Sequence, residues 1–168
     1  LEHLEFECGV MAGAAIDFFS VSLQTLIIGR GQQNTVTGIL TKSELPSLQR
    51  LQTYLDASTI KFVPPSVRDI VVPECFIEGH FLKLESLSLI SYNPVPIWVT
   101  QKTVFPANLI QLRLDRIGFS FDCFRNCQRL RVLDLTECSL QKPTDRTSWT
   151  RFLPRHLRKL TILGAKDF

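Results

Sequence analysis

Three cysteines and one histidine are the side chains of this chain that come closest to a metal-binding group. They are Cys123, Cys127, Cys138 and His156. A zinc site needs four clustered ligands, and such sites are recognised in a sequence by paired cysteines spaced C-x-x-C. No pair among these cysteines has that spacing, so the sequence predicts neither a metal site nor a cofactor.

Sequence motifs for catalysis are also missing. The segment Gly29-Arg30-Gly31 lacks the further glycine and the lysine of a phosphate-binding loop, and no serine stands in a G-x-S-x-G context. His3 and His80 have no carboxylate or cysteine at a spacing typical of a catalytic pair, and we interpret them as surface residues. The chain is therefore predicted not to be an enzyme.

Charged residues of both signs offer a different chemistry, the recognition of another protein. The candidate partner-binding residues are Arg113, Asp115, Arg116, Asp134, Glu137 and Lys159. Charged, hydrogen-bonding side chains suit this role when a rigid element presents them together on one face. The alternative interpretation is that they pair with one another, as on an ordinary exposed sheet.

The element expected to present these residues is a short repeat. Residues 130–140 read L-x-x-L-x-L-x-x-C-x-L, and the fixed positions are Leu130, Leu133, Leu135, Cys138 and Leu140. Because side chains alternate along a strand, Leu133 and Leu135 are predicted to point into the same core. Position 138 favours a small side chain that can hydrogen-bond the turning backbone. One such unit cannot bury its own apolar face, so the interpretation depends on a series.

The pattern recurs along the whole chain at irregular intervals. The eight predicted repeats begin at residues 1, 23, 48, 67, 84, 109, 130 and 157. The third repeat deviates, because Thr53 stands where an apolar residue is expected, and its register is left open. A proline precedes four of the repeats and is predicted to end the segment before each strand. These prolines are Pro46, Pro64, Pro106 and Pro154.

This series resembles the leucine-rich-repeat family. The resemblance implies an α/β solenoid, or horseshoe, with a parallel sheet on the concave face and short helices, 3₁₀ turns or loops on the convex face. We expect a helix over residues 11–19, a helical turn over residues 121–126, and irregular or 3₁₀ connections around Pro94, Pro96 and Pro143. Residues 1–168 are predicted to form a single domain of these irregular repeats.

Two branches of the family are similar to this chain in different ways. The repeat from Cys127 to Cys138 is similar to the cysteine-containing repeats of F-box proteins, which hold substrates for ubiquitin ligases. The irregular spacing and the segment 45–51 are similar to the sensing region of nucleotide-binding immune receptors, and the prolines resemble those of bacterial effector ligases. Each resemblance implies a protein partner, and the choice among receptor, ligase and scaffold stays open.

Strand residues between the fixed leucines face the concave side in this family, and they form two predicted columns. The first column is Glu5, Ile27, Val71, Ser88, Arg113, Asp134 and Thr161. The second is His3, Thr25, Asp69, Ser86, Gln111, Val132 and Lys159. The strand ends add Asp115, Arg116 and Glu137. The candidate partner-binding residues are therefore expected on the concave face of the last three repeats.

The net charge of +3 conceals an asymmetry between the halves. Residues 1–84 contain 6 Lys+Arg against 9 Asp+Glu, and residues 85–168 contain 13 against 7. A basic segment can contact an acidic partner or nucleic acid. Aromatic residues are not interleaved with these charges, as a single-strand binder requires. We therefore interpret the cations near the end of the chain as a solvated edge and expect no nucleic-acid partner.

The cysteine count and the ends of the chain bear on its context. Five cysteines are an odd number and no Asn-x-Ser/Thr acceptor occurs, which favours an intracellular protein of the cytoplasm or nucleus. The apolar stretch 11–28 is too polar for a membrane span. No polar cap is visible at either end, so we expect the chain to be part of a longer protein.

Together these features predict a protein-recognition module without catalysis of its own, which binds a protein partner on the concave face of the solenoid. An alternative is the substrate-guiding part of a ubiquitin ligase, of the F-box or the bacterial effector type. A third interpretation is a scaffold whose concave face binds nothing.

Overall fold

The computed structural model describes residues 2–6, 22–29, 45–53, 63–73, 83–92, 97–99, 105–141 and 153–164. The chain divides into two compact units, unit 1 over residues 1–84 and unit 2 over residues 85–168, and each is described by itself. The helix predicted over residues 11–19 lies outside the described residues.

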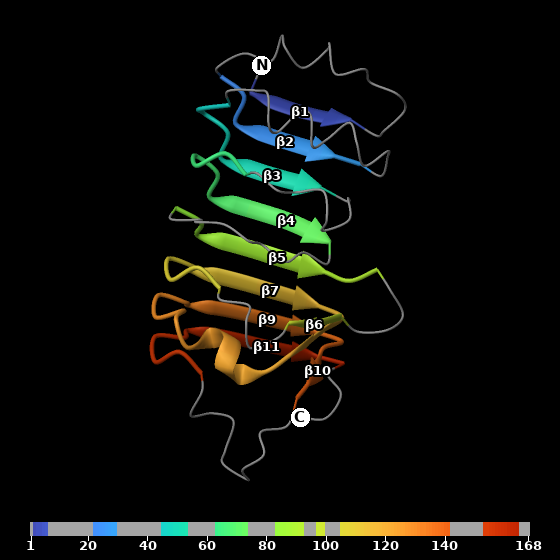
Figure 1. Ribbon diagram of the computed structural model, residues 1–168, viewed down its shortest axis with the longest axis vertical. Coiled ribbons are helices and arrows are strands. Elements are labelled where there is room, and N and C mark those ends of the chain that lie inside the picture. Colours follow the sequence, from blue (N-terminus) through green and yellow to red (C-terminus); the bar gives the residue numbers. More distant parts are fainter. Residues whose placement is uncertain are drawn as a thin grey trace. The chain divides into compact units, whose positions relative to one another are not determined.

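Unit 1 is built on four parallel strands, one from each of its repeats (Figure 1). The strands are β1 (His3–Phe6), β2 (Thr25–Ile28), β3 (Arg50–Thr53) and β4 (Asp69–Pro73). Neighbours in the sequence are neighbours in the sheet. Each strand begins two residues after the predicted start of its repeat, so the strand positions inferred from the leucine pattern are confirmed.

Unit 2 has the same plan. Its parallel strands are β5 (Ser86–Ile90), β7 (Gln111–Asp115), β9 (Val132–Thr136) and β11 (Lys159–Leu163). Here too each strand begins two residues after the predicted start. Both units are therefore stretches of parallel-sheet solenoid, which confirms the coarse architecture expected from the sequence.

A second sheet in unit 2 was not predicted. It consists of the short parallel strands β6 (Ile97–Val99), β8 (Ile117–Phe119) and β10 (Ser139–Leu140), in the order β10-β8-β6. The connection that contains β6 was expected to be irregular or 3₁₀, so that expectation was wrong for these three residues. They form a strand by pairing in parallel with β8.

The 3₁₀ helix η3 (Phe121–Phe124) follows β8 and is the one helix within the described ranges. It confirms the helical turn predicted at this place. Its Phe124 ring packs 5.5 Å from that of Phe119 and 6.1 Å from that of Phe105, centroid to centroid. No helix in the described part of the chain has the length and hydropathy of a transmembrane span.

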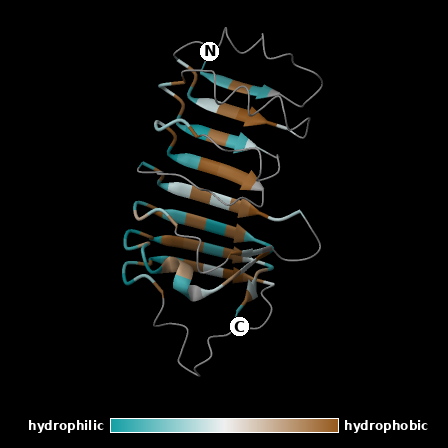
Figure 2. Cartoon of the chain, in the orientation of Figure 1, coloured by the Kyte–Doolittle hydropathy of each residue, from teal (hydrophilic) through white to brown (hydrophobic). Residues whose placement is uncertain are grey.

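The core of each unit consists of the fixed apolar side chains of its repeats. In unit 2, Leu112, Leu114, Leu133 and Leu135 have no exposed surface. Burial of one such side chain contributes about 1.5–3 kcal/mol relative to leaving it exposed. Figure 2 shows this pattern as apolar colour along strand segments such as β9 and hydrophilic colour in the turns that precede them.

The third repeat keeps the register of its neighbours despite its threonine. Thr53 is 1% exposed, and its Cα pairs with that of Ile28 in the adjacent strand. The position that the sequence left open is therefore an ordinary core position occupied by a β-branched polar residue.

A tight turn precedes β3, β4, β7, β9 and β11 and explains the prolines. The amides of Val67, Leu109 and Leu157 donate to the carbonyls of Pro64, Pro106 and Pro154, at 3.0, 3.2 and 3.1 Å. Proline has no N–H, but its position in this turn needs only a carbonyl acceptor. In the repeat at 130, Cys127 takes the same position, and its carbonyl accepts from Leu130 at 3.1 Å. Pro46 lies one place later, inside the turn from Leu45 to Leu48.

Candidate functional site

The strand register produces the two columns predicted from the leucine pattern. In unit 2, Ser86, Gln111, Val132 and Lys159 are aligned as Cα partners, and so are Ser88, Arg113, Asp134 and Thr161. In unit 1, the columns gain Arg50 and Gln52 from the third repeat. The side chains in these columns point away from the buried leucines, because successive residues of a strand face opposite sides.

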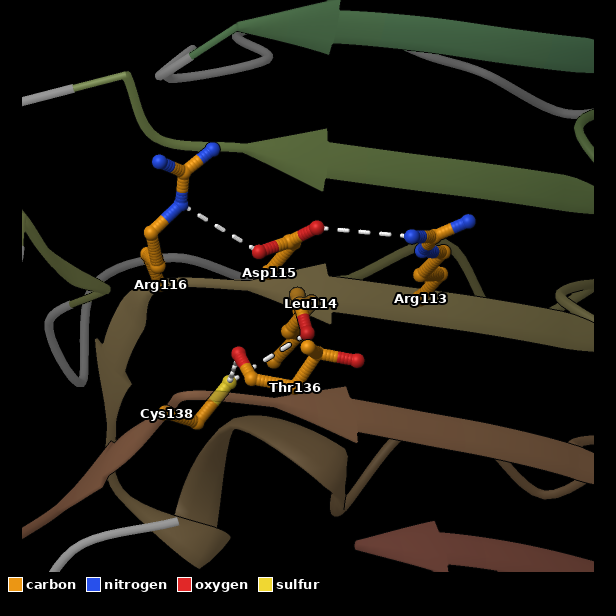
Figure 3. A network of polar contacts seen from close by, with 6 residues as sticks. All are labelled: Arg113, Leu114, Asp115, Arg116, Thr136 and Cys138. Atoms are coloured by element: carbon orange, nitrogen blue, oxygen red, sulfur yellow. Dashed lines mark hydrogen bonds and ion pairs between the residues drawn. The ribbon is translucent and has the colours of Figure 1, made fainter. Parts of the chain in front are cut away.

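Asp115 is the centre of the charged cluster (Figure 3). It lies at the end of β7, where one carboxylate oxygen, Oδ2, is 3.3 Å from Arg113 Nη2 and the other, Oδ1, is 3.4 Å from Arg116 Nε. The side chain of Asp115 is 15% exposed, whereas those of Arg113 and Arg116 are 48% and 39% exposed. One shielded carboxylate therefore holds two guanidinium groups, whose other N–H groups remain available to solvent.

Arg116 owes its position to an unusual backbone conformation. Its φ is 56°, and the equivalent residues of the next two repeats, Glu137 and Gly164, have φ of 50° and 60°. The strained corner is held by hydrogen bonds, since the Arg116 amide donates to the Thr136 carbonyl at 2.8 Å. The guanidinium carbon of Arg116 also lies 5.7 Å from the ring centroid of Tyr92, a cation–π distance.

Asp134 and Lys159 form a second pair on the same face. Asp134 Oδ1 is 3.6 Å from Lys159 Nζ, and the side chains are 22% and 64% exposed. The same oxygen is shielded from solvent and accepts no hydrogen bond from the described residues. Asp134 is the register partner of Arg113, so this pair lies beside the Asp115 group.

The structure thus brings together five of the six predicted residues, in two linked groups. Glu137 is exposed at the corner after β9, and within the described ranges it makes no side-chain ion pair. Its amide donates to the Leu163 carbonyl at 2.7 Å. The alternative interpretation, that these charged residues pair with one another, is therefore also observed in part. Arg113, Arg116 and Lys159 each have an acidic neighbour.

The buried cysteines are structural. Cys138 is fully buried, and its thiol donates to the Leu114 carbonyl at 3.3 Å and lies 3.4 Å from the Thr136 carbonyl. This is the backbone contact predicted for position 138. Burial raises the pKa of Cys127 to about 12, and the pKa of Cys123 and Cys138 is raised for the same first reason. Such thiols are poor nucleophiles, because the thiolate is the reactive form.

Within the described ranges, no three His, Cys, Asp or Glu residues form a group that could hold a metal ion. The chemistry available at the cluster is hydrogen bonding and charge pairing. Exposed N–H groups on Arg113 and Arg116 can donate to carboxylates, and Asp134 can accept from a cation or an amide.

Two contacts were missed from the sequence. Tyr92 is 39% exposed, and its ring centroid lies 5.7 Å from the guanidinium carbon of Arg116, a contact that the sequence analysis did not predict. His3, interpreted as having no carboxylate at a useful spacing, lies 3.9 Å from Glu5 Oε2. The contact between His3 and Glu5 could have been predicted from the alternation of strand residues, because residues 3 and 5 share a face.

Searches of protein-family models, of curated proteins and of solved structures found no match to this chain.

Proposed function

We propose that this chain is a leucine-rich-repeat recognition module whose concave face binds a protein partner. The binding residues are Arg113, Asp115, Arg116, Asp134, Glu137 and Lys159. Support for the family comes from the strand that follows each leucine start and from the buried hydrogen bond of Cys138. The proposal assigns recognition, and no catalysis, to this chain.

The observation that carries the proposal is the pair of arginines held by one shielded carboxylate. An arginine loses rotamer freedom when it binds, and each side chain ordered at an interface costs about 0.5–1.5 kcal/mol. Asp115 already restrains Arg113 and Arg116, at 3.3 and 3.4 Å, in the free protein. Part of the entropy cost of ordering Arg113 and Arg116 therefore does not have to be supplied by binding. The N–H groups of both arginines that do not contact Asp115 remain available to a partner.

The cluster has complementary sites for both signs of charge. The outward guanidinium groups fit carboxylates of the partner, and the exposed Glu137 carboxylate fits a lysine, an arginine or a backbone amide. Both kinds of site occur within three neighbouring strands, which is the size of patch that one turn or one short segment of a protein surface covers.

The experiment is affinity capture from the source cell, with the chain as bait beside a variant that carries Arg113→Glu and Asp134→Lys. We expect a reproducible partner to disappear from the captures of the variant. The matched control is Arg50→Glu in unit 1, because Arg50 is 49% exposed and lies 3.5 Å from Asp69, much as Arg113 is 48% exposed beside Asp115. Captures that are identical for the wild type and the double variant would contradict the proposal.

A reducing, intracellular compartment is part of the same proposal. Cys123, Cys127 and Cys138 are free and buried. We expect thiol titration of the unfolded chain, purified without reductant, to find all five cysteines free. A disulfide found in the protein from its source would place it in an oxidising compartment instead.

A further inference from the structure

Four exposed arginines gather in unit 2 at the turns that precede β9 and β11. We call them the arginine patch, and they are Arg129, Arg131, Arg155 and Arg158. Arg129 and Arg155 lie inside the two tight turns, and Arg131 and Arg158 occupy the position just before each strand. Figure 2 shows these turns in hydrophilic colour. None of the four belongs to the charged cluster around Asp115.

The backbone fixes the two pre-strand arginines side by side. The carbonyl of Arg131 accepts from the amides of Arg158 and Lys159, at 2.8 and 3.0 Å. The carbonyl of Ile110 accepts in the same way from Arg131 and Val132. Adjacent strands are about 4.8 Å apart, so the side chains of Arg131 and Arg158 start from neighbouring backbone positions.

Within the described part of the chain, no ion pair of the arginine patch offsets this like-charge arrangement. Segments 127–132 and 154–159 contain no acidic residue. Among the described residues, Arg131, Arg155 and Arg158 make no side-chain ion pair, and Arg129 donates to the amide oxygen of Asn108 at 3.3 Å. Like charges placed directly opposite each other on neighbouring strands destabilise a sheet. An anion bound across the patch would remove that repulsion.

We propose that the arginine patch binds a short acidic segment of a protein, with aspartate and glutamate carboxylates paired to the guanidinium groups. All four cations are arginines, whose planar forks pair with carboxylates through two parallel hydrogen bonds. The two turn segments contain no Phe, Tyr or Trp, so they lack the aromatic residues on which single-strand binders stack successive bases. The footprint covers only two repeats, which fits a short acidic run and not a long phosphate backbone.

The position of the patch distinguishes it from the proposed concave site. The charged cluster around Asp115 lies on the outward face of β7, β9 and β11 and at the corners just after β7 and β9. The arginine patch instead lies before β9 and β11. The two sites therefore present their charges at different places along the strands, and substitutions can separate them.

The test is the binding of a fluorescent oligoglutamate peptide to the whole chain, followed by fluorescence anisotropy, with oligoglutamine as the neutral peptide. We expect Arg131→Glu with Arg158→Glu to weaken oligoglutamate binding about tenfold or more, because attraction becomes repulsion at two of four cations. The second variant, Arg129→Glu with Arg155→Glu, changes only turn residues and should weaken binding in the same direction. Circular dichroism checks that each variant is folded.

Two controls locate the effect. Arg68→Glu lies at the same repeat position as Arg131 and Arg158, but in unit 1, and should leave binding unchanged. In the capture experiment, Arg131→Glu with Arg158→Glu should keep the partner that Arg113→Glu with Asp134→Lys loses, so a failure of the proposed function and a failure of the arginine patch give different results. Binding should disappear near 1 M salt, where the Debye length is about 3 Å.

Three results would overturn the inference. The first is no difference between oligoglutamate and oligoglutamine. The second is an equal loss of binding in Arg68→Glu and in the double variants. The third is tighter binding of a duplex or single-stranded oligonucleotide than of oligoglutamate at the same ionic strength, which would make the patch a nucleic-acid site.

Discussion

The two units have the same backbone plan but differ in the side chains placed just before their strands. In unit 1 the pre-strand residues are Glu2, Gln24, Gln49 and Arg68, and in unit 2 they are Glu85, Ile110, Arg131 and Arg158. In both units the carbonyl of one such residue accepts from two amides of the next repeat, at 2.8–3.0 Å. The register therefore does not depend on these side chains, and their charge is free to serve another purpose.

The same comparison applies to the outward columns. Unit 1 presents Arg50 beside Asp69, a simple pair of register neighbours. Unit 2 presents Asp115 between two arginines and Asp134 beside Lys159. The two units share a scaffold and differ in their outward residues. A difference in binding between them would therefore come from side chains and not from the fold.

The largest expected effect tests whether the scaffold is equivalent in the two units. Leu51 in β3 and Leu133 in β9 occupy the same repeat position, and both are 0% exposed. We expect Leu51→Ala and Leu133→Ala each to cost about 2–5 kcal/mol of unfolding free energy, since each leaves a cavity. Urea unfolding measures both. A much smaller loss for Leu51→Ala would show that the core of unit 1 collapses around the cavity, and would break the comparison.

The next effect separates two residues at one repeat position within unit 2. Cys138 donates to the Leu114 carbonyl, whereas Ile117, at the same position of the preceding repeat, is 1% exposed and purely apolar. Cys138→Ala should cost about 0.5–1.5 kcal/mol for the lost hydrogen bond, with a cavity contribution in addition. Cys138→Asn, which restores a donor, should recover part of that loss in the same unfolding assay. Equal losses for both variants would assign the whole effect to packing.

Alkaline pH should weaken unit 2 through its buried thiols. The pKa of Cys127 is raised from 9.0 to about 12, so between these values the unfolded chain loses a proton that the folded chain keeps. Stability is therefore fully present below pH 9.0 and falls as the pH rises toward about 12. Urea unfolding of the wild type and of Cys127→Ala isolates this contribution, because all other alkaline titrations are common to both. Parallel pH profiles would contradict it.

The smallest effects concern the exposed ion pairs. Double-mutant cycles on Arg50 with Asp69, and on Lys159 with Asp134, should each give about 0.2–1 kcal/mol at low salt. The Asp134 pair should give the larger value, because its carboxylate is 22% exposed against 31% for Asp69. Thermal unfolding at low and high salt measures both cycles. A reversed order would indicate that shielding of the carboxylate does not govern the strength of these pairs.

Much of the fold follows from the sequence because one repeat fixes the distance from its first leucine to its strand. The eight strands that carry the fixed leucines, β1–β5, β7, β9 and β11, begin where the leucine pattern predicts, and the columns that contain Arg113 and Asp134 follow from alternation alone. The turns before the strands were also predictable, because proline restricts the backbone where each strand must begin.

Other features depend on contacts between repeats, which a single sequence pattern does not encode. The strand β6 forms because β8 lies beside it, and Trp98 covers Gly118 so closely that an added Cβ there would lie 2.6 Å from the indole. The contact of Asp115 with Arg116 occurs beside the φ of 56° at Arg116, a corner conformation that its residue type does not favour. Pairing partners within the charged cluster could therefore not be assigned in advance.

The constant register has a consequence for how the chain can fold and diversify. Within the two units, strand partners are separated by between 19 residues, from Arg50 to Asp69, and 27 residues, from Asp134 to Thr161. The entropy of closing a flexible loop grows only with the logarithm of its length, so this range changes the closure cost by about 0.3 kcal/mol. Pairing can then spread from one repeat to the next, and insertions or deletions in the connections can accumulate with almost no penalty in folding.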